Sequence, residues 1–122
     1  MATITRRGDE VTTVGELPAV GSLAPIFTLA AADLSELCLV DLQGKNIILN
    51  IFPSIDTPTC ARSVREFNEK ATALDNVVVI CVSADLPFAL GRFCGAEGID
   101  HVLVGSTFRA SFGDDYLSLI HI

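Results

Sequence analysis

Tryptophan is absent from this sequence and tyrosine occurs once, so Leu, Ile, Val and Phe must build its hydrophobic core. Half of the residues are hydrophobic, which is enough for a real core and argues against a disordered chain. Basic residues are also few, since eight Lys and Arg stand against fifteen Asp and Glu and the net charge is −7. Nucleic-acid binding draws most of its affinity from clustered Lys and Arg, so we expect no nucleic-acid partner.

Long apolar runs are missing as well. No stretch approaches the roughly 18 apolar residues of a membrane-spanning helix. The first residues include Arg6 and Arg7, but no apolar segment follows them as it would in a secretory signal. We therefore expect one domain over residues 1–122, located in the cytoplasm and making no membrane contact.

Cysteines are present, but not at the spacing of a metal site. Cys38, Cys60, Cys81 and Cys94 contain no C-x-x-C pair, and the two histidines, at 101 and 121, offer no nearby pair of ligands. We expect no metal and no cofactor. Without an export signal, the four cysteines are expected to be free thiols in a reducing compartment.

Apolar runs and punctuation by Gly and Pro predict an α/β fold. Residues 3–6 and 11–14 resemble two short strands that form a hairpin around the "GD" at positions 8 and 9. The β-branched runs at 46–52 and 76–85 predict strands buried on both faces. Between them, Val64, Phe67, Ala71 and Leu74 follow the spacing of one helix face, so the segment predicts a β-α-β unit.

A second helix is expected over residues 87–96, with Asp85 as its N-cap, followed by a third parallel strand near residues 101–106. Phe88 and Phe93 are interpreted as packing residues of this helix, and Cys81 and Cys38 as core residues. In sheets of this kind, the chemistry lies beyond the carboxyl ends of the strands.

Cys60 is the residue that this rule singles out. Pro53 closes the first buried strand, Thr57 is a suitable N-cap, and Pro58 suits the first helical position, so Cys60 falls at the third. The free N–H groups and the dipole at that end favour a thiolate, to which Arg62 or Arg65 can add. Cys60 is thus either a small packing residue or a reactive thiol, and its position favours the second.

Three chemistries use such a thiol. A cysteine hydrolase needs a histidine base, and nothing places His101 or His121 near Cys60. A disulfide oxidoreductase needs a second cysteine three residues away, where this chain has Thr57. The third chemistry is peroxide reduction through a sulfenic acid that condenses with another thiol.

The motif "PSIDTPTC" resembles the P-x-x-x-[TS]-x-x-C active-site loop of peroxiredoxins. With "VICVSADLPFALGRFCGAEGI" and "STFRASFGDDY", the chain resembles the bacterial thiol peroxidase subfamily, of the atypical two-cysteine type, from about residue 14 to residue 116. The resemblance implies a thioredoxin-like fold with an N-terminal β-hairpin. It also implies that this chain reduces hydrogen peroxide and organic hydroperoxides, forms an intrachain disulfide, is recycled by a thioredoxin-type reductant, and is a homodimer.

The resemblance also assigns roles to individual residues. Cys60 corresponds to the peroxidatic cysteine, Thr57 to the hydroxyl that orients the peroxide, Pro53 to the residue that shields the loop, and Cys94 to the resolving cysteine. Local unwinding of the second helix would bring the two sulfurs together, since a disulfide needs Cα atoms within about 7 Å.

The resemblance stops near Tyr116, before "LSLIHI", and the segment that carries the family's catalytic arginine is not part of this sequence, so Arg109 is not that residue. We therefore expect a C-terminally truncated domain in which one face of the strands at 46–52 and 76–85 is exposed. The alternative to an active peroxidase is a non-catalytic fragment of the fold that acts only as a binding or aggregation-prone species.

Overall fold

The computed structural model describes residues 2–116 and the backbone of 120–121. Its elements, in chain order, are β1 Thr3–Arg6, β2 Asp9–Thr13, β3 Thr28–Ala30, β4 Glu36–Cys38, η1 Leu39–Leu42, β5 Asn46–Ile51, α1 Pro58–Ala71, β6 Val77–Ser83, α2 Pro87–Glu97, β7 Leu103–Ser106, α3 Phe112–Asp115 and β8 Ile120–His121. Within these residues, no helix is both long and apolar enough to cross a membrane.

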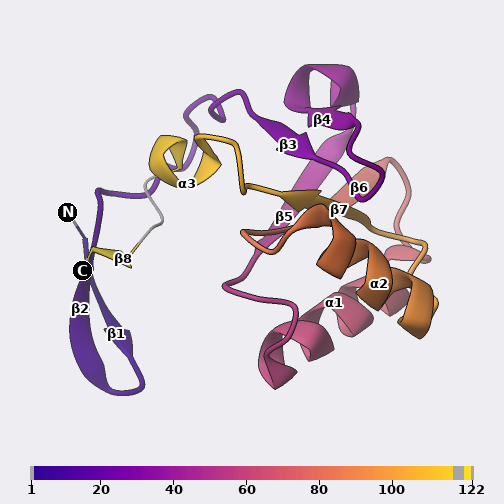
Figure 1. The fold of residues 1–122 in the computed structure, drawn as a ribbon. Helices are drawn as coiled ribbons and strands as arrows, with labels where there is room; N and C mark the ends of the chain where they lie inside the picture. Colours follow the sequence, from indigo (N-terminus) through magenta and orange to yellow (C-terminus); the bar gives the residue numbers. More distant parts are fainter. Residues whose placement is uncertain (1, 117–119, 122) are drawn as a thin grey trace.

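The central sheet has five strands in the order β4-β3-β7-β6-β5. Strands β5, β6 and β7 are parallel, and β3 runs antiparallel to both β7 and β4. The two crossovers that join the parallel strands are α1 and α2, which lie on the same face of the sheet (Figure 1). The predicted α/β fold is confirmed, including the β-α-β unit and the third parallel strand.

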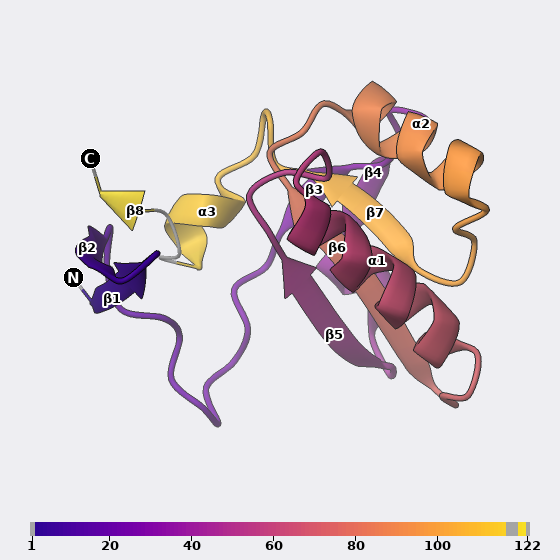
Figure 2. The same ribbon diagram turned by 90° about the horizontal axis from the view of Figure 1, so that it is seen from below.

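The predicted N-terminal hairpin is also confirmed. Strand β1 pairs with β2, and β8 adds a third strand to this small sheet. The turn lies one residue earlier than expected, at Arg7 and Gly8, which both have positive φ angles. Figure 2 shows the hairpin apart from the central sheet, joined to it by the segment that leads to β3.

Strand β6 is buried on both faces, as expected. Val79 and Cys81 belong to the cluster beneath α1 and α2, whereas Ile80 and Val82 belong to the cluster on the opposite face. Each of these four side chains is at most 2% exposed. The expectation that one face of this strand would be exposed is therefore wrong.

Three aromatic side chains cover that second face. The rings of Phe112 and Tyr116 stack with their centroids 4.4 Å apart, and Phe27 packs edge-on against Phe112 at 5.6 Å. The Tyr116 hydroxyl donates a hydrogen bond to the carbonyl of Pro25 at 2.8 Å. The short helix α3, which the sequence pattern does not predict, places Phe112 over the sheet.

Strand β5 does not match the prediction of burial on both faces. It is the edge strand of the described sheet, its four central residues are only half-buried, and Ile51 at its end is 46% exposed. An edge strand is less buried than a central strand, because it has a neighbouring strand, with its side chains, on one side only. The segment "LSLIHI" falls on residues 117–122, most of which lie outside the described residues.

Three predicted core positions are also wrong. Leu74 lies beyond the end of α1 and is 44% exposed, and Phe88 on α2 is 67% exposed. Cys38 is only half-buried, because β4 is the other edge of the sheet. By contrast Phe93 packs against the cluster beneath the helices, as expected.

Candidate active site

Cys60 lies in the first turn of α1, directly beyond the carboxyl end of β5. Helix α1 begins with Pro58, so Cys60 occupies the third helical position, as predicted. Its thiol is free and half-buried, and its side chain packs against the cluster that contains Ile55 and Val64. The thiol is thus held by packing in the first turn of a helix of 14 residues.

Thr57 is the N-cap residue by its backbone, which is extended with φ −89° and ψ 142°. Its hydroxyl, however, makes no capping bond and donates to the carbonyl of Ser54 at 2.9 Å. The side-chain cap expected from the sequence is therefore absent, and the hydroxyl instead fixes the turn before the helix. Pro53 and Thr57 are both exposed, so this loop presents its polar and apolar groups to solvent beside Cys60.

The two arginines expected to assist Cys60 bind carboxylates instead. Arg62 forms an ion pair with Glu66 on the same helix at 3.1 Å. Arg65 binds both carboxylate oxygens of Glu97 on α2, at 2.9 and 3.2 Å. Their charges are thus already paired, and the expectation that either adds to the thiolate is not supported.

Cys94 lies in the last turn of α2. It is a free, half-buried thiol, and burial raises the pKa of this thiol above its ordinary value. The next residues include Gly95 and Gly98, and Gly98 ends the helix in the left-handed conformation with φ 66°. The structure therefore places Cys94 where a helix ends, on the same face of the sheet as the helix that carries Cys60.

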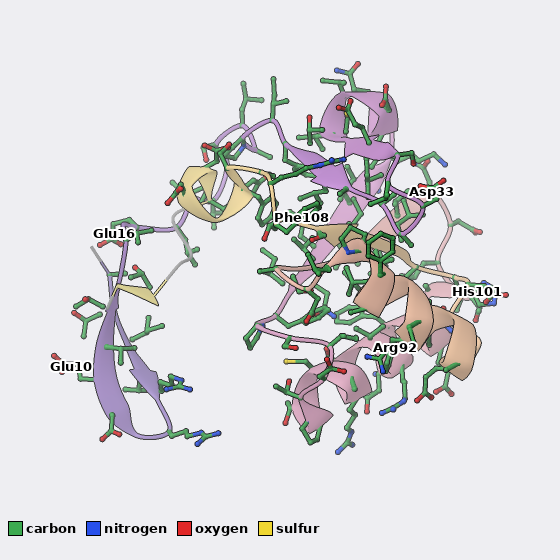
Figure 3. The ribbon with its side chains drawn as sticks, viewed as in Figure 1. Glu10, Glu16, Asp33, Arg92, His101 and Phe108 are labelled. Carbon is green, nitrogen blue, oxygen red and sulfur yellow. The ribbon has the colours of Figure 1, made fainter. Side chains whose placement is uncertain are left out.

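Helix α2 is tied to α1 and its loop by ion pairs. Besides the contact with Glu97, the guanidinium of Arg65 lies 5.4 Å from the centre of the Phe93 ring. Arg92 on α2 binds Asp56, in the loop before α1, at 3.1 Å. Figure 3 shows Arg92 on the side of α2 that faces α1. These contacts hold the helix of Cys94 against the helix and loop of Cys60.

The other two cysteines are placed differently. Cys81 is completely buried in β6, and burial raises its pKa to about 11, with its sulfur 3.7 Å from the side-chain nitrogen of Asn50. Cys38 lies on the edge strand β4, with its sulfur 3.6 Å from the hydroxyl of Thr28. Cys81 thus lies within its strand, and Cys38 lies on β4, the edge of the sheet opposite to β5, whose end leads to Cys60.

The two histidines lie away from Cys60. His101 precedes β7, and its backbone N–H donates to the Asn68 side chain, near the other end of α1 (Figure 3). The backbone of His121 pairs with Thr12 in the hairpin sheet. Among the side chains that the structure describes, no histidine base for a cysteine hydrolase lies beside Cys60.

Asp85 is the residue whose place the sequence interpretation missed. It was expected to cap α2, but the N-cap of α2 is Leu86, without a side-chain bond. The Asp85 carboxylate instead accepts hydrogen bonds from Ser54, Ile55 and Ser83. The sequence feature that could have indicated this role is the position of Asp85 at the carboxyl end of a buried strand, because such sheets carry their chemistry at that edge.

Comparisons with known proteins agree with this geometry. The Redoxin family matches residues 19–118. The thiol peroxidase of Mycobacterium tuberculosis is 59% identical over 116 residues, which cover 95% of this chain and 70% of the relative. The thiol peroxidase of Corynebacterium glutamicum is 54% identical over 109 residues, covering 89% of this chain and 66% of the relative.

Among solved structures, a peroxiredoxin-like protein from Aquifex aeolicus superposes with a TM-score of 0.87 at 36% identity, covering 97% of this chain and 69% of that one. A thiol peroxidase from Chromobacterium violaceum has the same fold, with a TM-score of 0.81 at 20% identity, over 97% of this chain and 69% of that one. The β-α-β unit that positions Cys60 is thus part of a recurring fold. The chain belongs to the Redoxin family and, within it, to the thiol peroxidases.

Proposed function

We propose that this chain reduces hydroperoxides through Cys60. The Cys60 thiolate attacks the terminal oxygen of the peroxide, the O–O bond breaks, and water or an alcohol leaves after taking up a proton. The sulfur is oxidised to a sulfenic acid and the peroxide is reduced. The observation that carries the proposal is the position of Cys60 at the third residue of α1, at the carboxyl edge of the sheet.

Thr57 and Pro53 complete the proposed site. The Thr57 hydroxyl donates its proton to the Ser54 carbonyl at 2.9 Å, and an oxygen that donates in this way can still accept a hydrogen bond from the peroxide. We assign Thr57 the role of orienting the peroxide on Cys60. Pro53, two residues beyond the end of β5, has no N–H to offer the peroxide, and we assign its exposed ring the role of shielding the loop.

Cys94 is the proposed resolving cysteine. Its thiol attacks the sulfenic sulfur of Cys60, an S–S bond forms, and the oxygen leaves as water. Burial raises the pKa of Cys94, so in the folded helix it stays protonated and does not compete with Cys60 for peroxide. Attack requires the two Cα atoms to come within about 7 Å, for which α2 unwinds at its glycine-containing end.

A dithiol reductant of the thioredoxin type then returns both cysteines to thiols by exchange. We further propose that the chain acts as a homodimer in the cytoplasm, where reducing conditions regenerate the thiols between cycles.

Peroxide consumption by the purified protein with excess dithiol tests this function. The wild type is expected to consume hydrogen peroxide catalytically, Cys60→Ser to lose the activity, and Cys38→Ser to keep it. After one equivalent of peroxide, blocking of the free thiols and peptide mapping should identify a Cys60–Cys94 disulfide. Activity that survives in Cys60→Ser would refute the proposal, and a dominant link to Cys81 or Cys38 would refute the role of Cys94.

A further inference from the structure

Asp85 connects the carboxyl ends of all three parallel strands. One carboxylate oxygen accepts a hydrogen bond from the Ser54 hydroxyl at 2.8 Å, just beyond β5. The other accepts from the backbone N–H of Ile55 at 2.7 Å and from the hydroxyl of Ser83, at the end of β6, at 2.6 Å. The backbone carbonyl of Asp85 accepts from the hydroxyl of Ser106, at the end of β7. One residue thus binds three segments that are far apart in the sequence.

The loop that Asp85 holds is the one that leads to the thiol. The carbonyl of Ser54 accepts two hydrogen bonds from Thr57, one from the hydroxyl at 2.9 Å and one from the backbone N–H at 3.2 Å. The side chain of Ile55 is 2% exposed and lies in the cluster against which Cys60 packs. Fixing Ser54 and Ile55 therefore fixes the place of both Thr57 and Cys60.

These bonds favour an ionised carboxylate. Burial of Asp85 favours the neutral form, but the hydrogen bonds from Ser83, Ile55 and Ser54 outweigh it, and the pKa lies below its ordinary value. All three donors point their hydrogens at the carboxylate, which as an ion has only acceptors to offer. The backbone N–H of Ile55 cannot be reversed, so this position needs an acceptor.

We propose that Asp85 is a positioning residue of the peroxidase site, which holds the loop from Ser54 to Thr57 so that the Thr57 hydroxyl and the Cys60 sulfur engage the same peroxide molecule. The inference rests on the proposed function. Asp85 does not touch the peroxide and acts only through Ser54 and Ile55. A misplacement of about 1 Å between two reacting groups can lower a rate about a hundredfold, so a loop tether at this place affects rate directly.

Two reagents separate positioning from plain stability. The reaction with hydrogen peroxide requires both the thiolate and the correctly placed Thr57 hydroxyl. The reaction with iodoacetamide requires only an accessible thiolate at Cys60. A carboxylate that merely stabilises the fold would leave both rates unchanged in those molecules that remain folded. Loss of positioning should lower the peroxide rate alone.

The test measures both second-order rates at Cys60 in the wild type, Asp85→Ala and Asp85→Asn, at a temperature where circular dichroism shows each to be folded. We expect the peroxide rate to fall at least tenfold in Asp85→Ala, which removes every side-chain acceptor. The peroxide rate of Asp85→Asn should fall less, because the amide oxygen can still accept a hydrogen bond from the backbone N–H of Ile55. Iodoacetamide rates should stay within threefold of the wild type in both variants.

Asp33→Asn is the matched control. Asp33 lies in the turn between β3 and β4 (Figure 3), where its carboxylate binds only Ser35 among the described residues. The same change of charge there should alter neither rate. If Asp85→Ala does not fold, Asp85→Asn, which keeps the size of the side chain and one acceptor, decides the question.

An active wild type whose Asp85 variants keep the full peroxide rate would overturn this inference and leave the proposed function intact. Equal losses with both reagents would also overturn it, since they would indicate a change in the thiolate or its access rather than in positioning. A wild type that consumes no peroxide would overturn the proposed function itself.

Discussion

Replacing Gly95 by alanine is expected to slow formation of the Cys60–Cys94 disulfide two- to fivefold. Gly95 follows Cys94 in α2, and a Cβ atom at this position would meet nothing within 4 Å. The substitution therefore adds helix propensity without a clash, about 0.5–1 kcal/mol in favour of the helix. That energy makes the unwound state about two- to fivefold rarer, and Cys94 can reach Cys60 only from that state.

Gly98→Ala is expected to have the opposite effect. Gly98 closes α2 with φ 66°, a conformation that disfavours a side chain by about 1 kcal/mol or more. Its N–H donates to the carbonyl of Cys94, so strain there loosens the turn that carries the thiol. Disulfide formation should become about fivefold faster. Opposite changes at two neighbouring glycines cannot arise from general damage to the protein.

The assay is a single turnover. One equivalent of peroxide is added, the reaction is quenched with an alkylating reagent at increasing times, and mass spectrometry quantifies the disulfide and the sulfinic acid of Cys60. Gly95→Ala should accumulate more sulfinic acid when further peroxide is added, because the Cys60 sulfenic acid persists longer before Cys94 reacts with it. Wild-type or faster disulfide formation in Gly95→Ala would refute the view that unwinding of α2 limits this step.

Three further predictions follow from the contacts. Arg65→Gln removes an ion pair between α1 and α2 and should speed disulfide formation severalfold at low salt, whereas Arg62→Gln, whose partner lies on its own helix, should not. Because burial raises the pKa of Cys81 from 9.0 to about 11, the unfolded thiol ionises first, so the free energy of unfolding should fall as the pH rises through this window. The fall should reach about 2.7 kcal/mol at most, and urea titrations of Cys81→Ala should lack it. Gly105→Ala would place its Cβ 2.7 Å from Cδ1 and 2.9 Å from Cβ of the buried Leu29. We expect the free energy of unfolding to fall by about 1–3 kcal/mol, which an unchanged thermal transition would contradict.

Local rules predict much of this protein from its sequence. The apolar runs that become β5 and β6 are short and rich in β-branched residues, the first is bounded by Gly44 and Pro53, and the spacing between the runs is that of a helix face. The position of Cys60 also follows from local rules, since an apolar run that stops at Pro53 and a helix that begins at Pro58 leave it in the first turn. Each of these features depends on residues within a few positions of one another.

Tertiary structure alone decided the surroundings of that thiol. Asp85 is of a residue type that often caps helices, which is why the sequence suggested that role. Its partners Ser54 and Ile55 lie 31 and 30 residues away in sequence, and only the parallel pairing of β5 with β6 brings them together. Arg65 likewise meets Glu97 across 32 residues. The cover of β6 by Phe112 depends on how α3 packs back on the sheet. Such contacts arise from the packing of whole elements, and a local pattern does not specify which side chains that packing will bring face to face.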